Sequence, residues 1–310
     1  MAVEMWLSSD DLGVQAIRAV GPRKMKARGG SNTPISHEGR FVIIEIRGTL
    51  TKYGSPFGPA TIELVELVRQ ATADPTVSTI VLWVDSGGGE VQGIVELANA
   101  VAIAKQKKLV ITLVDGVCAS GAYFFASQST RIYATTRIDS IGSIGVVLAL
   151  IDSSGMLGRS GVKMVRIRSG ELKGIGLPGT TISDEETEYL TQHVRMVADE
   201  FVMAVSTGRK LPPDQVRQLA TGAVWPAMEA VRIGLIDGIA SREDIIAEAS
   251  TSHLMEYANL FAAARKMGLT SELSNFKVLN DQPQLKAQAA EFHCLAAVSQ
   301  KELCDKSERK

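Results

Sequence analysis

The stretch TIVLWVDSGGGEVQG, residues 79–93, contains the features that decide the fold. Its first six residues are mostly apolar, which is typical of a strand buried on both faces of a parallel sheet. Three consecutive glycines follow, and a helical pattern then begins at Glu90 and runs to Lys105. A strand, a glycine turn and a helix in this order predict one βα unit.

The same alternation continues on both sides of this unit. Before the unit come the apolar run FVIIEI at 41–46 and a helical pattern over 62–73, and after it comes the apolar run LVITLV at 109–114. Because parallel strands need long crossover connections, usually helices, the pattern predicts an α/β fold with a mostly parallel sheet. We expect this domain to span residues 39–248.

The two ends of the chain lack this alternation of strands and helices. Residues 1–38 hold a short amphipathic pattern and a basic, glycine-rich stretch, so we expect an N-terminal arm and linker. Residues 249–310 hold one amphipathic helical pattern and a polar, glutamine-rich tail. We expect this part to be a C-terminal helical and polar extension.

Composition excludes several classes of protein. The formal net charge is −1 with both signs mixed, so we expect no nucleic-acid partner. No apolar run reaches the roughly 18 to 20 residues of a membrane span, and no secretory signal is recognisable, so we expect no membrane anchor. The few, scattered cysteines predict neither a disulfide framework nor a metal cluster and favour the cytoplasm. They are Cys118, Cys294 and Cys304.

The glycine turn at 87–89 predicts a site for a negatively charged atom. Glycines let the backbone turn sharply, and a turn that leads into a helix exposes N–H groups. The turn lacks both the G-x-G-x-x-G spacing and the lysine of a phosphate-binding loop, which disfavours a nucleotide. An oxyanion hole is one interpretation, and a tight turn without a ligand is the other.

A second turn, CASGAYFFAS at 118–127, places Ser120 between Ala119 and Gly121. It follows the apolar run at 109–114, so the Ser120 hydroxyl should lie at the same sheet edge as the glycine turn. The amide of Gly121 and an amide of the glycine turn can then both donate to an oxyanion next to this hydroxyl. A purely structural role for Ser120, capping the next helix, is the alternative.

A nucleophilic serine needs a base. The four histidines lie in the arm, in the tail or within a helical pattern, which disfavours a Ser-His-Asp triad without excluding it; they are His37, His193, His253 and His293. Lys173 lies in the glycine-rich loop at 168–179, after a predicted strand KMVRIR at 163–168. Burial and nearby cations such as Arg166 or Arg168 can lower the pKa of a lysine enough for it to act as a base. From the residues alone, Lys173 is one of several possible lysines.

Five motifs together resemble the signal peptide peptidase A family of serine proteases, peptidase family S49, in order, spacing and residue type. They are DSGGG at 85–89, VDGVCASGAYFFAS at 114–127, RIDSIGSIGVV at 137–147, SGELKGIG at 169–176 and GAVWPAMEAVRIGLIDGIA at 222–240. The last motif is the loosest, with slightly altered spacing at the matching positions Val224, Ala230, Gly234, Leu235 and Asp237. The similarity covers roughly residues 40–245.

The resemblance implies a serine endopeptidase with a Ser-Lys dyad. By the motifs, Ser120 matches the nucleophile, Lys173 the general base and Gly88 a residue whose amide binds the oxyanion. Ser143 matches a serine that hydrogen-bonds the lysine, and the amide of Gly121 is the expected second oxyanion donor. No cofactor and no metal is implied.

Two positions depart from the family pattern. Gly87 replaces a proline, and Ala122 replaces the second glycine after the nucleophile. Both residues are small, so we expect the geometry of the site to be kept. Apolar residues around the crevice would favour small or aliphatic substrate side chains, although core packing is the expected role of any one of them; they are Val91, Val117, Tyr123 and Phe124.

By the same resemblance, the fold is a crotonase-like or Clp-like spiral of βαβ units. Such proteins usually assemble into homo-oligomeric rings, in which a dyad can be completed across a subunit boundary. The helical pattern from Ser183 to Thr207 is the expected contact between subunits.

The N-terminal pattern is most similar to a prophage branch whose members are capsid assembly proteases acting on scaffold, portal or coat proteins. We therefore expect protein substrates, in a bacterial host cytoplasm or an assembling procapsid. A housekeeping peptidase that acts like a signal peptide peptidase without a membrane anchor is the alternative. Two other classes also remain open: a crotonase-type acyl-CoA enzyme with Glu90 or Glu171 as base, and a non-catalytic capsid component.

Overall fold

The computed structural model describes residues 35–38 and 41–249. The expected N-terminal arm and C-terminal extension lie almost entirely outside the described residues, and both stay predictions. None of the described helices combines the length and the apolar character that a membrane crossing requires.

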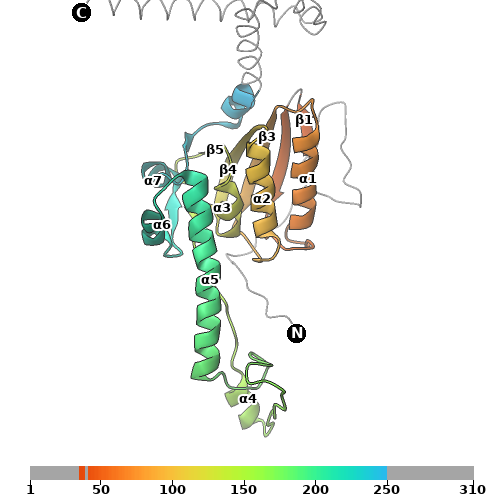
Figure 1. The fold of residues 1–310 in the computed structure, drawn as a ribbon, viewed down its shortest axis with the longest axis vertical. Helices are drawn as coiled ribbons and strands as arrows, with labels where there is room; N and C mark the ends of the chain where they lie inside the picture. Colours follow the sequence, from red (N-terminus) through yellow and green to blue (C-terminus); the bar gives the residue numbers. More distant parts are fainter. Residues whose placement is uncertain (1–34, 39–40, 250–310) are drawn as a thin grey trace, which may run out of the picture. The chain divides into compact units, whose positions relative to one another are not determined.

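The described strands form one sheet (Figure 1). Their order is β1-β2-β3-β4-β5-β8, with β6 paired to β4 and β7 paired to β6. The β1/β2 and β6/β7 pairs are antiparallel, and the other pairs are parallel. This confirms the predicted α/β class with a mostly parallel sheet. The strands are β1 Ile35–Glu38, β2 Phe41–Arg47, β3 Thr79–Ser86, β4 Leu109–Ala119, β5 Arg131–Ala134, β6 Ser140–Gly142, β7 Val224–Pro226 and β8 Gly238–Ile239.

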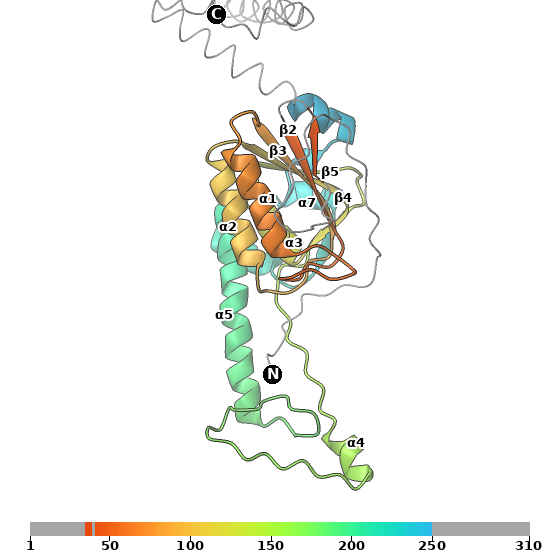
Figure 2. The ribbon, with the colours of Figure 1, turned by 90° about the vertical axis from the view of Figure 1, so that its right-hand side faces the viewer.

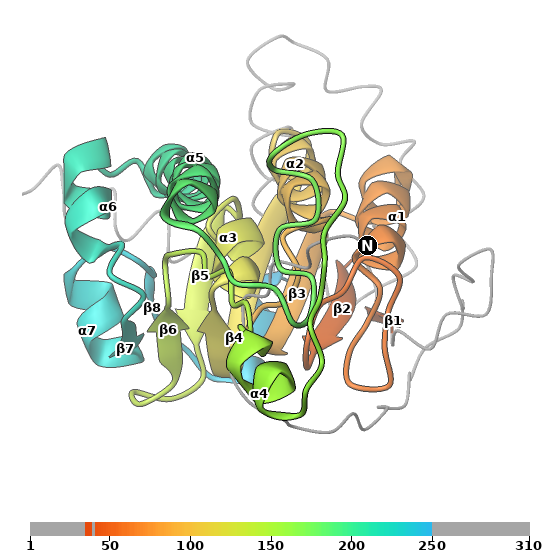
Figure 3. The same cartoon turned by 90° about the horizontal axis from the view of Figure 1, so that it is seen from below.

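Three helices lie against one face of this sheet (Figure 3). They are α1 Thr61–Ala73, α2 Ile94–Lys105 and α3 Gly121–Ala126. Because successive side chains of a strand point to opposite faces, every second residue of the strands enters the core beneath these helices. The core cluster accordingly includes Val42, Ile44 and Ile46 of β2 and Ile80, Leu82 and Val84 of β3.

Strand β4 positions the candidate site, and it is longer than the apolar run at 109–114 that predicted it. Its first half pairs with β5 through residues 111–114, and its second half pairs with β6 through residues 117–119. Gly116 lies between the two halves with a φ of 111°. The strand therefore continues to the residue before Ser120.

Two predicted elements differ in the structure. The helix expected from Glu90 begins at Ile94, because residues 87–90 run beside the loop after β2, where Gly89 forms a bridge to Leu50. The strand expected at 163–168 is wrong. Its residues pair with no described strand, so nothing supplies the hydrogen bonds that a strand needs.

Helix α5, Asp184–Arg209, is the longest of the described helices and carries a second part of the chain away from the sheet (Figures 1 and 2). Its buried apolar residues, Phe201, Val202 and Val205, lie in its last third, near α3. The segment that includes α4, Ser154–Arg159, lies at the other end of α5. Helices α6, Pro213–Leu219, and α7, Ala227–Arg232, follow.

Candidate active site

Ser120 occupies a strained turn between β4 and α3. Its φ is 53° and its ψ is −124°, a conformation that non-glycine residues rarely adopt. Its amide donates to the carbonyl oxygen of Gly142 at 2.7 Å, which fixes the turn against β6. Its side chain makes no capping hydrogen bond to α3, so the geometry does not support a role in helix capping. Strain of this kind is concentrated at functional sites.

The glycine turn lies directly against the Ser120 turn. A Cβ atom added to Gly88 would lie 2.7 Å from the amide nitrogen of Gly121 and 3.0 Å from the Ser120 Cβ. The φ of Gly88 is 99°, which also favours glycine. On its other side the turn is held by Leu50, whose amide donates to the Gly88 carbonyl oxygen at 2.8 Å. The expected meeting of two turns at one sheet edge is therefore present.

The two expected oxyanion donors differ in their present hydrogen bonds. Gly121 is the first residue of α3, and the first amides of a helix have no acceptor within it. The amide of Gly88 instead donates to Ser86 Oγ at 3.2 Å. Sequence reasoning did not single out Ser86, although its place directly before the glycines was a usable signal.

Ser143 stands next to the Ser120 turn. It follows Gly142, which pairs with Ala119 in the parallel register of β4 and β6. Its φ is 49°, and its amide donates to the Ala223 carbonyl oxygen at 2.7 Å. Four of the five predicted site residues therefore come together at adjoining strand ends.

Cys118 lies two residues before Ser120 and is fully buried. Burial raises the pKa of its thiol above the ordinary range because the interior disfavours a thiolate. The thiol therefore does not compete with Ser120 as a nucleophile.

Lys173 does not lie beside Ser120 in this chain. It belongs to the lysine segment, which we define as residues 160–183 and which lies at the N-terminal end of α5 (Figures 1 and 2). Arg166 and Arg168 fasten this segment to Glu186 in the first turn of α5, at 2.8 and 2.9 Å. In contrast, Gln128, just after α3, donates to the carbonyl oxygen of Ala204. Glu186 and Ala204 are about 27 Å apart along the helix axis at 1.5 Å per residue.

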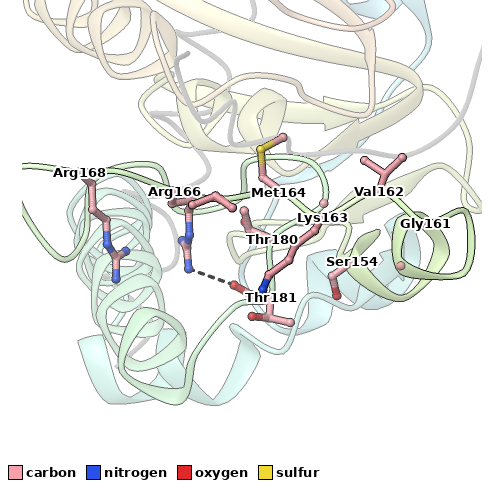
Figure 4. Close-up of a pocket in the computed structure, with 12 residues that line it drawn as sticks. Ser154, Gly161, Val162, Lys163, Met164, Arg166, Arg168, Thr180 and Thr181 are labelled. Atoms are coloured by element: carbon pink, nitrogen blue, oxygen red, sulfur yellow. Dashed lines mark hydrogen bonds between the residues drawn. The ribbon is translucent and has the colours of Figure 1, made fainter.

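The two arginines expected near Lys173 both contact one carboxylate. Arg166 and Arg168 share the carboxylate of Glu186, so each positive charge has an anionic partner. A hollow of about 790 Å³ opens beside them, and its lining includes Lys163, Arg166 and Thr181 (Figure 4). None of the residues that line this hollow belongs to the two turns at Ser120, so it is not the predicted crevice.

The remaining candidates have other positions. His193 is exposed on α5, and His253 and His293 lie outside the described residues. Glu90 accepts a hydrogen bond from the Lys52 amide at 2.9 Å. Tyr123 is fully buried and donates to the Leu235 carbonyl oxygen at 2.7 Å, so its role is in the core.

Comparisons with known proteins identify related chains. The model of peptidase family S49 matches residues 102–256. A candidate protease of Methanocaldococcus jannaschii is 31% identical over 62% of this chain and 64% of its own length. A candidate signal peptide peptidase of Enterococcus faecium is 33% identical over 58% of this chain and 52% of its own. The capsid assembly protease C of Escherichia phage lambda is 29% identical over 66% of this chain and 48% of its own.

The similar region thus spans less than two thirds of each of these relatives. The family model nevertheless covers half of this chain and includes the Ser120 turn and the lysine segment. The chain belongs to peptidase family S49.

Proposed function

We propose that this protein is a serine endopeptidase in which Ser120 is the nucleophile and Lys173 the general base. The observation that carries the proposal is the contact between the two turns. The strained Ser120, the first amide of α3 and Gly88 meet where two neighbouring strands end, with no room for a side chain on Gly88. This arrangement suits acyl transfer, because it places a hydroxyl beside backbone donors for a developing negative charge.

In the proposed mechanism, neutral Lys173 removes the proton from Ser120 Oγ as that oxygen attacks a peptide carbonyl. The amides of Gly88 and Gly121 bind the tetrahedral oxyanion, and Ser143 orients the lysine. Protonated Lys173 then gives its proton to the leaving amine. In the second half of the reaction, Lys173 takes a proton from water as the water attacks the acyl-enzyme, and it returns that proton to Ser120 Oγ as the acyl–oxygen bond breaks.

We propose that the lysine comes from a second copy of the chain, because the lysine segment is fastened to the far end of α5 in the same copy. The exposed surface supports such an assembly. Large apolar side chains cluster on and near the lysine segment, where Ile151 is 85% exposed, Val165 67% and Ile167 96%. On α5, Met196 is also 60% exposed. Apolar surface of this extent is typical of a protein interface, so we propose a homo-oligomer, and a ring is the expected form.

The crotonase alternative is less well supported. It needs a free carboxylate base next to the oxyanion donors, but Glu90 is engaged by the Lys52 amide and Glu171 lies in the lysine segment. It also leaves the strained conformation of Ser120 without a purpose.

Labelling with a fluorophosphonate tests the proposal. The wild-type protein should form one Ser120 adduct per active site, whereas Ser120→Ala should form none. Lys173→Ala should lower the labelling rate by at least about 100-fold, as expected for loss of a general base. Lys163→Ala is the matched control, since Lys163 is an exposed lysine of the same segment, and it should label like the wild type. Normal labelling of Ser120→Ala would reject the nucleophile, and normal labelling of Lys173→Ala would reject the base.

For the biological role we propose a phage or prophage capsid assembly protease, working in a host cytoplasm or an assembling procapsid on scaffold, portal or coat proteins. Similarity to capsid assembly protease C and to the head-tail preconnector protein GP5 of phage P21 supports this role. Similarity to a candidate signal peptide peptidase supports the housekeeping alternative.

Co-expression with the products of neighbouring genes distinguishes the two roles. Processing of a structural protein by the wild type but not by Lys173→Ala supports capsid assembly. If that protein remains intact while the wild type is labelled at Ser120, the housekeeping role is favoured.

A further inference from the structure

Ser86 is the last residue of β3 and makes two hydrogen bonds through one buried hydroxyl. The residue is 2% exposed. Its Oγ donates to the Gly48 carbonyl oxygen at 2.6 Å and accepts from the Gly88 amide at 3.2 Å. The hydroxyl therefore links the loop after β2 to the glycine turn.

The second of these bonds conflicts with the proposed catalytic state. Gly88 is one of the two proposed oxyanion donors, yet its N–H points to Ser86 Oγ. The single chain thus holds one of the two proposed donors in a competing hydrogen bond.

We propose that Ser86 is a positioning residue that holds the Gly88 amide away from the oxyanion site until acylation. This inference rests on the proposed function. During attack by Ser120 Oγ, the Gly88 N–H leaves Ser86 Oγ and turns to the developing oxyanion, while Ser86 stays bound to Gly48.

The surrounding hydrogen bonds confine this change to one peptide unit. On one side, Ser86 is tied to Gly48. On the other side, the Gly88 carbonyl oxygen accepts from the Leu50 amide at 2.8 Å and the Glu90 amide donates to the Leu50 carbonyl oxygen at 2.8 Å. The peptide between Gly87 and Gly88 joins these two fixed points. It is flanked by glycines, which tolerate the backbone angles that a rotation requires.

The exchange favours the transition state over the ground state. An N–H group binds a charged oxygen more strongly than a neutral hydroxyl. The oxyanion therefore competes successfully with Ser86 Oγ, whereas the neutral carbonyl of a bound substrate does not. An interaction made only in the transition state accelerates the chemical step, but breaking the bond to Ser86 takes back part of that gain.

Ser86→Ala removes the competing acceptor and tests this role in the full-length protein. The measured quantity is the second-order rate constant for fluorophosphonate labelling of Ser120. In that reaction Ser120 Oγ bonds to phosphorus, fluoride leaves, and the serine proton passes to the base. We expect this rate constant to rise about threefold to tenfold, which corresponds to the net strength of one neutral hydrogen bond. The melting temperature should fall, because the Gly48 carbonyl loses its donor.

A rise in rate together with a fall in stability separates this role from a merely structural one. Ser86→Thr keeps the hydroxyl and should restore the wild-type rate. Ser206→Ala is the matched control, because Ser206 is a buried serine that donates to the Leu211 carbonyl oxygen at 2.7 Å, outside the site. It should lose stability without labelling faster. If Ser86→Ala does not fold, Ser86→Cys replaces it, since a thiol sulfur is a weaker acceptor and should give a smaller rise.

The outcomes separate the two proposals. If the wild type is labelled at Ser120 and the Ser86 variants react at the same rate or more slowly, this inference is overturned and the proposed function stands. If Ser120 is not labelled in any of the proteins, both are rejected.

Discussion

Gly88 shows how much the site depends on the absence of a side chain. A Cβ atom at this position would lie 2.7 Å from the Gly121 amide nitrogen and 3.0 Å from the Ala119 carbonyl oxygen. Both neighbours are backbone atoms of the turn that carries Ser120, so neither can move without moving Ser120. The closeness that excludes a side chain also brings the two proposed oxyanion donors together.

Gly88→Ala should therefore damage both activity and stability. We expect peptidase activity to fall on the order of 100-fold, as when one oxyanion donor is lost. The free energy of unfolding should fall by about 1–3 kcal/mol, because alanine is strained at positive φ and collides with backbone. Gly155→Ala is the control, since an added Cβ there meets nothing within 4 Å. An active, stable Gly88→Ala protein would contradict the proposed geometry.

At the scale of elements, the first turn of α5 determines where the lysine segment lies. Ser183 and Glu186 form a capping box, in which each side chain accepts from the backbone N–H of the other residue. Glu186 also accepts from Arg166 and Arg168 of the lysine segment. One buried carboxylate thus both begins the helix and fastens the segment that carries Lys173.

This junction should weaken in acid. The Ser183 amide and the guanidinium groups of Arg168 and Arg166 hold the pKa of Glu186 below its ordinary value. Because the folded-state pKa is lowered, these contacts contribute their full stability to the fold above the unfolded-state pKa, which is about 4.3 for glutamate. This contribution is lost as the pH falls through the folded-state pKa. Limited proteolysis of the lysine segment should therefore be slow at neutral pH and accelerate below about pH 4.

Glu186→Gln should remove that pH dependence, with the segment cut readily at neutral pH as well. Glu188→Gln is the matched control, since Glu188 lies on the same helix and only accepts from Gln192. It should behave like the wild type. If Glu186→Gln and the wild type were cut alike throughout the pH range, the carboxylate would not be what holds the segment.

At the scale of the whole molecule, the length of α5 separates Lys173 from Ser120. Only the last third of the helix is packed against the core through apolar side chains, so its first turns carry the lysine segment well beyond the sheet. At that distance, Lys173 can act as the proposed base on its own chain only after a large rearrangement. It can serve a neighbouring chain in an assembly.

Mixing two inactive variants tests this arrangement. Ser120→Ala and Lys173→Ala proteins should each be inactive. If each site takes its serine from one chain and its lysine from the neighbouring chain, an assembly of equal amounts of both variants should recover roughly one quarter of the wild-type activity. The control replaces Ser120→Ala by a double variant that lacks both side chains and should recover nothing. No recovery in a verified mixed assembly would place both groups on one chain.

Features set by neighbouring residues were predictable from the sequence, whereas features set by contacts between distant residues were not. The strands at 41–46 and 79–84 and the Ser120 turn were predictable, because apolar runs and small residues act within a few positions. The strand expected at 163–168 failed, because its alternating apolar residues have no sheet to join. The hydrogen bond between Ser86 and Gly48 was not predictable either, because Gly48 lies on another strand connection.

The sequence by itself determined the βα order and the glycine turn, since backbone freedom and hydrophobic periodicity are local properties. Only the tertiary structure decided that Gly88 contacts the Ser120 turn, that Ser86 engages the Gly88 amide, and that Lys173 lies elsewhere. Those facts follow from the pairing of β2, β3 and β4 and from the length of α5, and both depend on packing between residues far apart in the chain.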